Sequence, residues 1–177
     1  MKKRVLLAIA FLSSLALAHQ PLFNAGSPTR EQAFVIPNLE ISKVITSESR
    51  SERNWYALEV TRNLELDLTL FVGASCPKAF TPRLYLIAPN LEGTAPFTLP
   101  QGMGALAIAN TWTDYSGHGV VARKSPSFER RLSAGKYYLV VEHGQSKGWY
   151  FLSFGGSEVS GGTTEGRTAL ARFNRCE

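Results

Sequence analysis

Three histidines are the residues of this sequence best suited to hold a metal ion, and one of them follows a predicted cleavage point. In "SLALAHQPLF" (residues 14–23), a cut after Ala18 would make His19 the first residue of the exported protein. Its free α-amine and its Nδ1 could then chelate Cu(II), an ion that nitrogen ligands suit. The copper site would need a second imidazole, from His118 or His143. Asp114 lies four residues before His118, so on a strand both side chains would face the same side.

The same stretch also allows an interpretation without any metal. A cut after Ala16 would place Leu17 first and remove the chelating terminus. Some residue must also follow any leader, so a histidine at that position needs no function. Copper binding is therefore the alternative hypothesis for this chain, and the main one requires no cofactor.

The first 18 residues have the three parts of a secretory signal. "MKKR" is positively charged, "VLLAIAFLSSLALA" is apolar, and alanines stand at positions 16 and 18. The apolar run is 14 residues long, whereas a membrane-spanning helix needs roughly 20. We expect residues 1–18 to be a cleaved signal peptide, with no transmembrane anchor after cleavage. The product is then expected to be secreted, periplasmic or at the cell surface.

A catalytic triad is suggested by Asp114, Ser116 and His118 in "TDYSGHG" (residues 113–119). Members of a triad converge from separate elements on one oxyanion-stabilising site. Three residues spaced by two along one strand instead point in parallel, and the flanking glycines favour a turn. No other credible pair of nucleophile and base is found in the sequence. We predict no catalytic residue and no enzyme, and copper redox chemistry is the one enzymatic alternative left open.

Aromatic residues offer a different chemistry, because their rings can stack on sugars or on a partner protein. The candidates come from the segments 136–154 and 89–126: Trp112, Tyr115, Tyr138, Trp149 and Phe151. The alternative is that segment 89–126, which also contains Phe97, folds over the outward rings as a second small core, since it is too apolar to remain in water. In that case the seam between this segment and the rest of the domain is the expected ligand site.

Two cysteines, Cys76 and Cys176, are expected to form a disulfide, because an even number in an exported protein favours pairing. A metal or redox pair is the weaker interpretation, since the spacing is not Cys-x-x-Cys. The bond would close a loop of about 100 residues, which is worth up to roughly 4.7 kcal/mol by restricting the unfolded chain. We expect it to hold the C-terminal residues against the domain.

The charge of the chain gives no reason to expect nucleic acid as a partner. The sequence has 19 Lys+Arg and 14 Asp+Glu, a net charge of +5, but Lys2, Lys3 and Arg4 belong to the predicted leader. The remaining 16 basic residues leave a net charge of only +2. No run of five or more basic residues is present, so nucleic-acid binding is excluded.

The elements that must position these residues are predicted to be short strands. "LELDLTLFV" (64–72) and "WYALEV" (55–60) alternate apolar and polar residues with the period of two that a half-buried strand requires. "KYYLVVEH" (136–143) and "GWYFLSF" (148–154) flank a short turn and predict a hairpin. Further strands are predicted at 40–46, 83–88, 105–109, 119–122 and 127–132. No segment shows a helical period longer than about two turns.

Many short strands separated by glycine and proline predict an all-β domain, an antiparallel β-sandwich or jelly roll. We place the sandwich at residues 40–154. Residues 19–39 contain three prolines and are expected to lie extended across an edge. Within residues 155–177, residues 155–167 are predicted to be a flexible Gly/Ser/Thr-rich linker, and the rest a tail that the disulfide ties back.

Four stretches resemble the bacterial pre-peptidase C-terminal domain: "SERNWYALEV", "LELDLTL", "PRLYLIAP" and "LSAGKYYLVVEHGQSKGWYFLSFGG". Within the last of these, "AGKYYLVV" is the most specific element. The resemblance spans residues 44 to about 154. The resemblance implies a small secreted β-sandwich of a kind usually appended to exported proteases and related enzymes. Some members bind calcium through acidic side chains, but Asn54 and Arg83 stand where acidic residues are expected. Because arginine cannot ligate calcium, this site is not carried over.

Together these features predict an exported, non-catalytic β-sandwich that acts as a binding or structural module. The candidate ligands are a glycan, a peptide or another protein of the cell envelope. The alternative is a copper-binding protein that uses His19 with His118 or His143.

Overall fold

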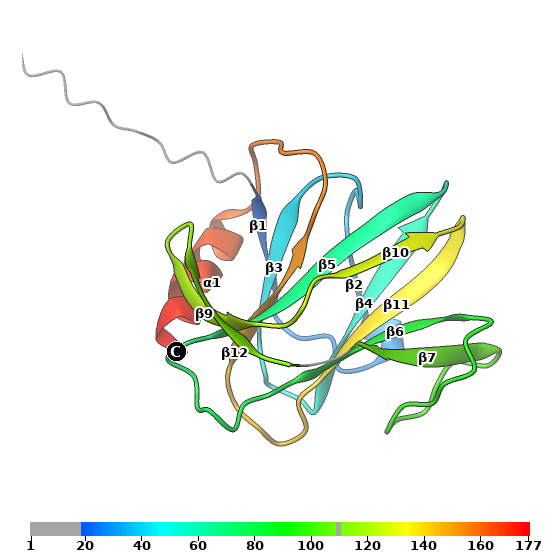
Figure 1. Ribbon diagram of the computed structural model, residues 1–177, viewed down its shortest axis with the longest axis horizontal. Helices are drawn as coiled ribbons and strands as arrows, with labels where there is room; N and C mark the ends of the chain where they lie inside the picture. Colours follow the sequence, from blue (N-terminus) through cyan, green and yellow to red (C-terminus); the bar gives the residue numbers. More distant parts are fainter. Residues whose placement is uncertain (1–18, 109–110) are drawn as a thin grey trace, which may run out of the picture.

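Two β-sheets face each other in the computed structural model, which describes residues 19–108 and 111–177 (Figure 1). Sheet A has seven strands and sheet B has five. The β-sandwich predicted from the alternation of apolar residues is therefore the observed fold. The predicted signal peptide (residues 1–18) and the last residue of the strand predicted at 105–109 lie outside the described residues.

The order of strands across each sheet differs from their order along the chain. Sheet A consists of β1 (Gln20–Asn24), β3 (Lys43–Glu48), β12 (Trp149–Phe154), β5 (Leu64–Gly73), β9 (Val120–Lys124) and β8 (Thr113–Gly117), with β10 (Phe128–Leu132) also pairing with β5. Sheet B consists of β2 (Phe34–Val35), β4 (Arg53–Val60), β11 (Gly135–Glu142), β6 (Arg83–Pro89) and β7 (Met103–Ile108). A 3-10 turn, η1 (Arg30–Gln32), and a helix, α1 (Thr164–Arg175), complete the chain. Within the described ranges, no helix is both long and apolar enough to cross a membrane.

The sheets are mixed rather than purely antiparallel as predicted. The pairs β1–β3 and β2–β4 are parallel. Both extra strands come from the N-terminal segment 19–39, which runs along the edges of the sandwich and adds one strand to each sheet. This segment is therefore part of the sandwich and does not merely lie across it.

The interior is filled by the alternating residues that the sequence pattern identified. Leu66, Leu68 and Leu70 of β5 are buried between the sheets, where they meet Tyr56 of β4 and Leu139 of β11. A second apolar cluster lies on the outer face of sheet B and is made of Trp55, Ala57, Tyr85, Ile87, Ala105, Tyr138 and Val140. Trp55 of this outer cluster also lines the candidate site described below.

The predicted hairpin between residues 136–143 and 148–154 is wrong, because its two strands lie in different sheets. β11 pairs with β4 and β6, whereas β12 pairs with β3 and β5. Each strand uses both edges for other partners, so the connection 143–148 crosses from sheet B to sheet A. Outward side chains of β11 and β12 consequently lie on opposite faces of the molecule.

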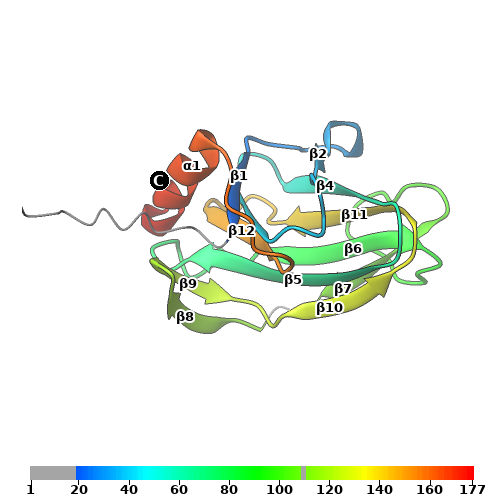
Figure 2. The same ribbon diagram turned by 90° about the horizontal axis from the view of Figure 1, so that it is seen from above.

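The C-terminal segment contains a 12-residue helix, α1, where the sequence predicted no helix. Thr163 caps its first turn, since the Thr163 Oγ1 accepts a hydrogen bond of 2.9 Å from the Gly166 N–H. Ala169 and Phe173 are buried against the outer face of sheet A. The helix lies alongside β1 (Figure 2). The predicted flexible linker is therefore wrong for residues 164–167.

Two glycines allow α1 to approach β1 closely. A Cβ on Gly166 would lie 2.2 Å from the Pro21 carbonyl oxygen, and one on Gly162 would lie 2.4 Å from the Pro21 Cδ. The same carbonyl accepts a hydrogen bond of 2.9 Å from the Thr163 N–H. The glycines that suggested a flexible linker are thus required for a tight backbone contact.

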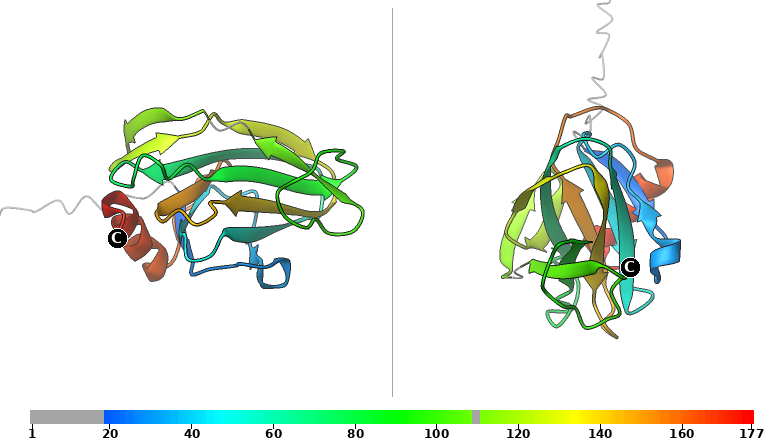
Figure 3. Two further views of the ribbon diagram at one scale, coloured as in Figure 1. Left: turned by 90° about the horizontal axis from the view of Figure 1, so that it is seen from below. Right: turned by 90° about the vertical axis from the view of Figure 1, so that its right-hand side faces the viewer.

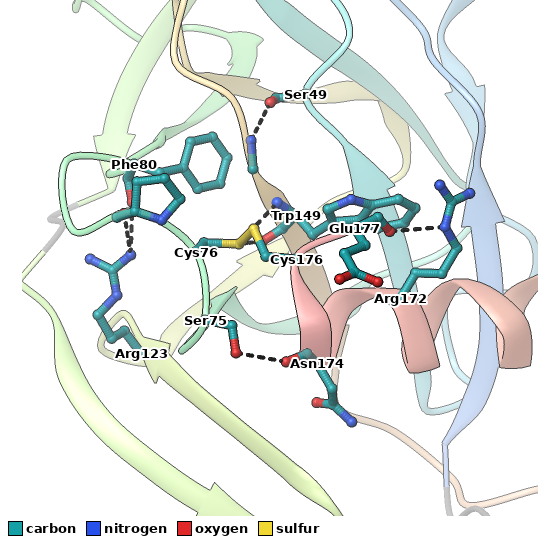
Figure 4. Close-up of a disulfide and its surroundings, with 12 residues drawn as sticks. Ser49, Ser75, Cys76, Phe80, Arg123, Trp149, Arg172, Asn174, Cys176 and Glu177 are labelled. Carbon is teal, nitrogen blue, oxygen red and sulfur yellow. Dashed lines mark hydrogen bonds between the residues drawn. A yellow bond between two sulfur atoms is a disulfide. The ribbon is translucent and has the colours of Figure 1, made fainter.

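The predicted disulfide between Cys76 and Cys176 is confirmed, and it joins residues 100 positions apart (Figure 4). It connects the end of α1 to the loop that follows β5. The Trp149 N–H donates to the Cys76 Sγ at 3.3 Å, and the Ser75 Oγ donates to the Asn174 carbonyl oxygen at 3.0 Å. Helix α1 is therefore held at both ends, by β1 at its first turn and by the disulfide at its last.

Candidate functional site

The structure separates the histidines of the predicted copper site. Gln20, the neighbour of His19, pairs with Lys43 at the first residue of β3. His143 lies beyond the other end of this strand, where its N–H donates to the Glu52 carbonyl oxygen at 2.9 Å. The six residues of β3 place its ends about 16 Å apart at 3.3 Å per residue. One metal ion cannot bridge this separation.

His118 is also far from His19. It lies in the exposed turn between β8 and β9, and the neighbouring Gly119 carbonyl oxygen accepts a hydrogen bond from Asn174 near the end of α1. The residues next to His19 contact the opposite end of this helix, which for 12 residues is about 18 Å away. Asp114 is on β8 opposite Arg123, while His118 lies in the turn with a φ of 51°, so the two do not share a strand face.

The structure therefore gives no support to the predicted copper site. Among residues 19–108 and 111–177, no group of three His, Cys, Asp or Glu side chains could hold a metal ion. The sequence alone could not reveal this, because it does not say which end of a sheet each loop occupies.

The predicted aromatic residues do not form one surface. Tyr138 lies on the outer face of sheet B, where its ring is 5.8 Å from that of Trp55. Trp149 and Phe151 lie on the outer face of sheet A, and α1 covers both. The Phe173 ring is 4.7 Å from that of Phe151, and the Arg172 guanidinium is 4.8 Å from the Trp149 ring centroid.

Segment 89–126 covers a part of each outer face. Tyr115 packs against Phe71 of sheet A at 5.2 Å. Phe97 packs against Trp55 of sheet B at 5.4 Å. Trp112 is half-buried, with the Arg123 guanidinium 6.0 Å from its ring. Segment 89–126 thus forms the expected second core over the cluster that includes Tyr138. Over Trp149 and Phe151 the cover is α1 instead.

Burial displaces the pKa values of several ionisable groups inside the protein. Burial lowers the pKa of His143 to about 4, and the positive charges of Lys147 and Arg53 add to this effect. Neither ring nitrogen of His143 has a hydrogen-bond partner in the described structure. Burial also lowers the pKa of Lys43 to about 8, and its ammonium donates to the carbonyl oxygens of Asn38 and Ile41.

Two tyrosines form a buried hydrogen-bonded pair between the sheets. The hydroxyl oxygens of Tyr56 and Tyr150 are 3.0 Å apart, and Ser47 and Asn54 are each 2.7 Å from one of them. Burial raises the pKa of both phenols. Each hydroxyl is satisfied by its neighbours, so this network orders the interior and is closed to a substrate.

The outer face of sheet B contains a cleft of about 330 Å³, which we call the Trp55 cleft. Residues 28–31, around η1, form one wall and residues 97–100 form the other. Arg53 and Trp55 of β4 also line it. Two loops therefore border a rigid sheet, which is the arrangement that binding sites commonly use.

Arg53 gives this cleft a cationic hydrogen-bond donor. Its guanidinium carbon lies 5.2 Å from the Phe97 ring centroid, and one terminal nitrogen is 3.0 Å from the Glu52 carboxylate. Its Nε is buried and has no partner among the described atoms. The cleft thus combines aromatic carbon with a cationic donor, which suits binding through packing and hydrogen bonds.

The Trp55 cleft was not predicted from the sequence, although one signal for it is present there. In "WYALEV" the alternation directs Tyr56 inward, so Trp55 must face outward. A large aromatic residue on an outward position requires a cover or a ligand. Arg53 follows the same alternation and lies on the same face. What the sequence could not show is that residues 28–31 would form the opposite wall.

Two other clefts are less well formed for binding. One of about 310 Å³ lies beside α1 and includes Phe23 and Trp149, but Arg172 already covers the Trp149 ring. Another of about 490 Å³ lies beyond β4, where Arg62 and Glu40 form an exposed ion pair. Helix α1 and loop 91–100 lie at opposite ends of the molecule, so the Trp55 cleft is remote from the α1 cleft (Figure 3).

Comparison with known proteins gives likenesses among solved structures only. No protein-family model matches the chain, and no curated protein matches it. A solved structure of the pre-peptidase C-terminal domain of a collagenase from Bacillus anthracis is similar to it, with a TM-score of 0.39 and 13% sequence identity over 70% of this chain and 94% of that chain. This is a domain of the kind that "AGKYYLVV" and the neighbouring strands resemble.

Proposed function

We propose that this chain is a non-catalytic binding module that works outside the cytoplasm. The Trp55 cleft is the observation that carries the proposal, because it places a cation and aromatic carbon between two loops on a rigid sheet. Its ligand would be a glycan, a peptide or another protein of the cell envelope. The groups whose pKa values are displaced by burial, His143, Lys43 and the Tyr56–Tyr150 pair, line neither this cleft nor the two less well formed ones.

The disulfide supports the proposed location. Cys76 is buried and bonded to Cys176, and such bonds persist in oxidising compartments. The leader-like residues 1–18 support the same conclusion. N-terminal sequencing of the exported protein is expected to begin at His19, and recovery of the intact leader on the exported protein would contradict this part of the proposal.

A titration that is monitored by nuclear magnetic resonance tests the binding function. The exported, 15N-labelled protein is titrated separately with chito-oligosaccharides and with extended peptides of defined sequence. We expect saturable shifts of the Trp55 indole N–H and of Thr98, and at least a tenfold loss of affinity in Arg53→Ala. Arg130→Ala is the matched control, because Arg130 is an exposed arginine of β10 on the other sheet. Shifts confined to other surfaces, or turnover of a probe, would contradict the proposal.

A further inference from the structure

Segment 94–99 lies over the outer face of sheet B in the manner of an extended peptide. Ala95, Phe97 and Leu99 are half-buried against the outer cluster, while the residues between them are exposed. This period of two is that of an extended chain whose alternate side chains enter a surface. The segment nevertheless belongs to no strand of the structure.

Phe97 inserts its ring into a box made by three side chains. The ring centroid is 5.4 Å from that of Trp55 and 5.5 Å from that of Tyr85, with interplanar angles of 71° and 88°. The Arg53 guanidinium carbon completes the box at 5.2 Å. Edge-to-face rings and a guanidinium over the ring both attract an aromatic side chain.

The backbone contributes little to holding this segment in place. The Gly93 carbonyl oxygen accepts from the Ala105 N–H at 2.8 Å, and the Pro100 carbonyl oxygen accepts from the Met103 N–H at 3.1 Å. Between these two points, the described structure shows no backbone hydrogen bond for residues 94–99. The segment is therefore anchored at its ends and attached between them by side-chain packing alone, which favours local opening.

We propose that the outer face of sheet B binds an extended peptide segment with an aromatic residue and an aliphatic residue two positions later, and that segment 94–99 occupies this site in the free protein. This inference rests on the proposed binding function and names a ligand class for that face, because the box around Phe97 shares Arg53 and Trp55 with the Trp55 cleft. Phe97 and Leu99 then stand in for the side chains of the partner.

The geometry favours a peptide over a glycan as the occupant. A sugar needs an open aromatic face on which to stack, but Trp55 and Tyr85 are each only 5% exposed. Their ring edges instead form a slot that a phenyl ring already fills. Arg53, whose Nε has no partner among the described atoms, can donate to the carbonyl oxygens that an extended peptide presents.

The attached segment would compete with any external peptide. A short tether keeps the cis segment at an effective concentration on the order of millimolar. The apparent affinity for a partner is then the intrinsic affinity multiplied by the fraction of open protein. Removing the Phe97 ring should open the box. The affinity for an external peptide should then rise.

Fluorescence anisotropy with a labelled peptide of sequence TAPFTLP, identical to residues 94–100, tests this inference. We expect Phe97→Ala to bind the peptide at least ten times more tightly than the wild type, and Arg53→Ala in the Phe97→Ala background to lose this gain. A TAPATLP peptide should not bind. Phe128→Ala is the matched control, because Phe128 is also half-buried but packs against the main core, and it should give no gain.

Several results would overturn the inference. A folded Phe97→Ala protein that does not bind TAPFTLP is one of them. If Phe97→Ala does not fold, millimolar TAPFTLP must still shift the Trp55 indole N–H and the amides of residues 94–99 in the wild type, and no shift would again refute it. If chito-oligosaccharides bind the cleft and the peptide does not, the peptide inference fails while the proposed binding function stands.

Discussion

His143 is a titratable residue whose effect on stability follows directly from where it is buried. Its ring lies between those of Phe80 and Tyr150, at 6.3 and 6.0 Å, and its two nitrogens have no partner in the part of the chain that the structure describes. Protonation would place a charge among aromatic rings and near Lys147 and Arg53. The sequence placed His143 at the end of a predicted strand and offered it only as a possible second imidazole of a copper site.

The stability of the protein is expected to fall below pH 6.5 because of His143. In the unfolded chain its pKa is about 6.5, whereas in the folded protein it is about 4, so the unfolded state binds more protons between these values. The loss begins near pH 6.5 and is complete below pH 4, and it corresponds to at most about 3 kcal/mol. Urea unfolding of His143→Leu should show a smaller loss between pH 7 and 4. His118→Asn, an exposed control, should behave as the wild type, and an unchanged pH dependence in His143→Leu would refute the assignment.

Helix α1 shows how the same composition can indicate two different elements. Glycine and threonine at residues 161–164 suggested a linker, because glycine is the most flexible residue. In the structure these residues bring the helix against β1, and the apolar spacing of Ala169 and Phe173 fits one helix face. This spacing was a detectable signal, but a three-turn helix offers few repeats of it.

Gly166→Ala should destabilise the protein, although alanine is the better helix former. Helix propensity alone would favour the substitution by about 1 kcal/mol. The added Cβ would lie 2.2 Å from the Pro21 carbonyl oxygen, so either α1 or β1 must move. Thermal unfolding should show a lower midpoint for Gly166→Ala. Thr168→Ala, at an exposed position of α1, reports the effect of propensity and should change the midpoint little. A midpoint at or above that of the wild type in Gly166→Ala would show that β1 can shift to accept the Cβ without a loss of stability.

At the scale of the whole molecule, the disulfide closes the chain around the sandwich. It joins the loop after β5 to the end of α1, so that the helix cannot leave the outer face of sheet A while the bond persists (Figure 4). Phe173 and Ala169 cover Phe151 and its neighbours there, and these rings would meet water without the helix. The bond thus holds the C-terminal helix in place and keeps the apolar surface beneath it covered.

Removal of the disulfide should loosen α1 before the sandwich unfolds. In Cys76→Ala/Cys176→Ala, the loss of a 100-residue loop constraint should lower the free energy of unfolding by up to about 4.7 kcal/mol. Hydrogen exchange should become faster in α1 while the amides of β5 and β12 remain protected. Thr163→Ala, which removes only the N-cap, should cost about 1 kcal/mol. Equal protection of α1 with and without the disulfide would show that packing alone holds the helix.

The sequence by itself determined the features that depend on local periodicity and on residue chemistry. Alternation in residues 55–60 and 64–72 identified β4 and β5 and their inward faces, because the side chains of a strand alternate whatever its partners are. The even number of cysteines identified the disulfide, because two thiols in an oxidising compartment pair with each other.

Only the tertiary structure decided which strands are neighbours and which loops meet. The partners of β11 and β12 depend on contacts between residues far apart in the chain, so a short turn between them did not make a hairpin. The same long-range contacts separated His19 from His143 and brought residues 28–31 opposite residues 97–100. A site made from several loops follows from the order of strands across the sheets, and local sequence patterns do not contain that order.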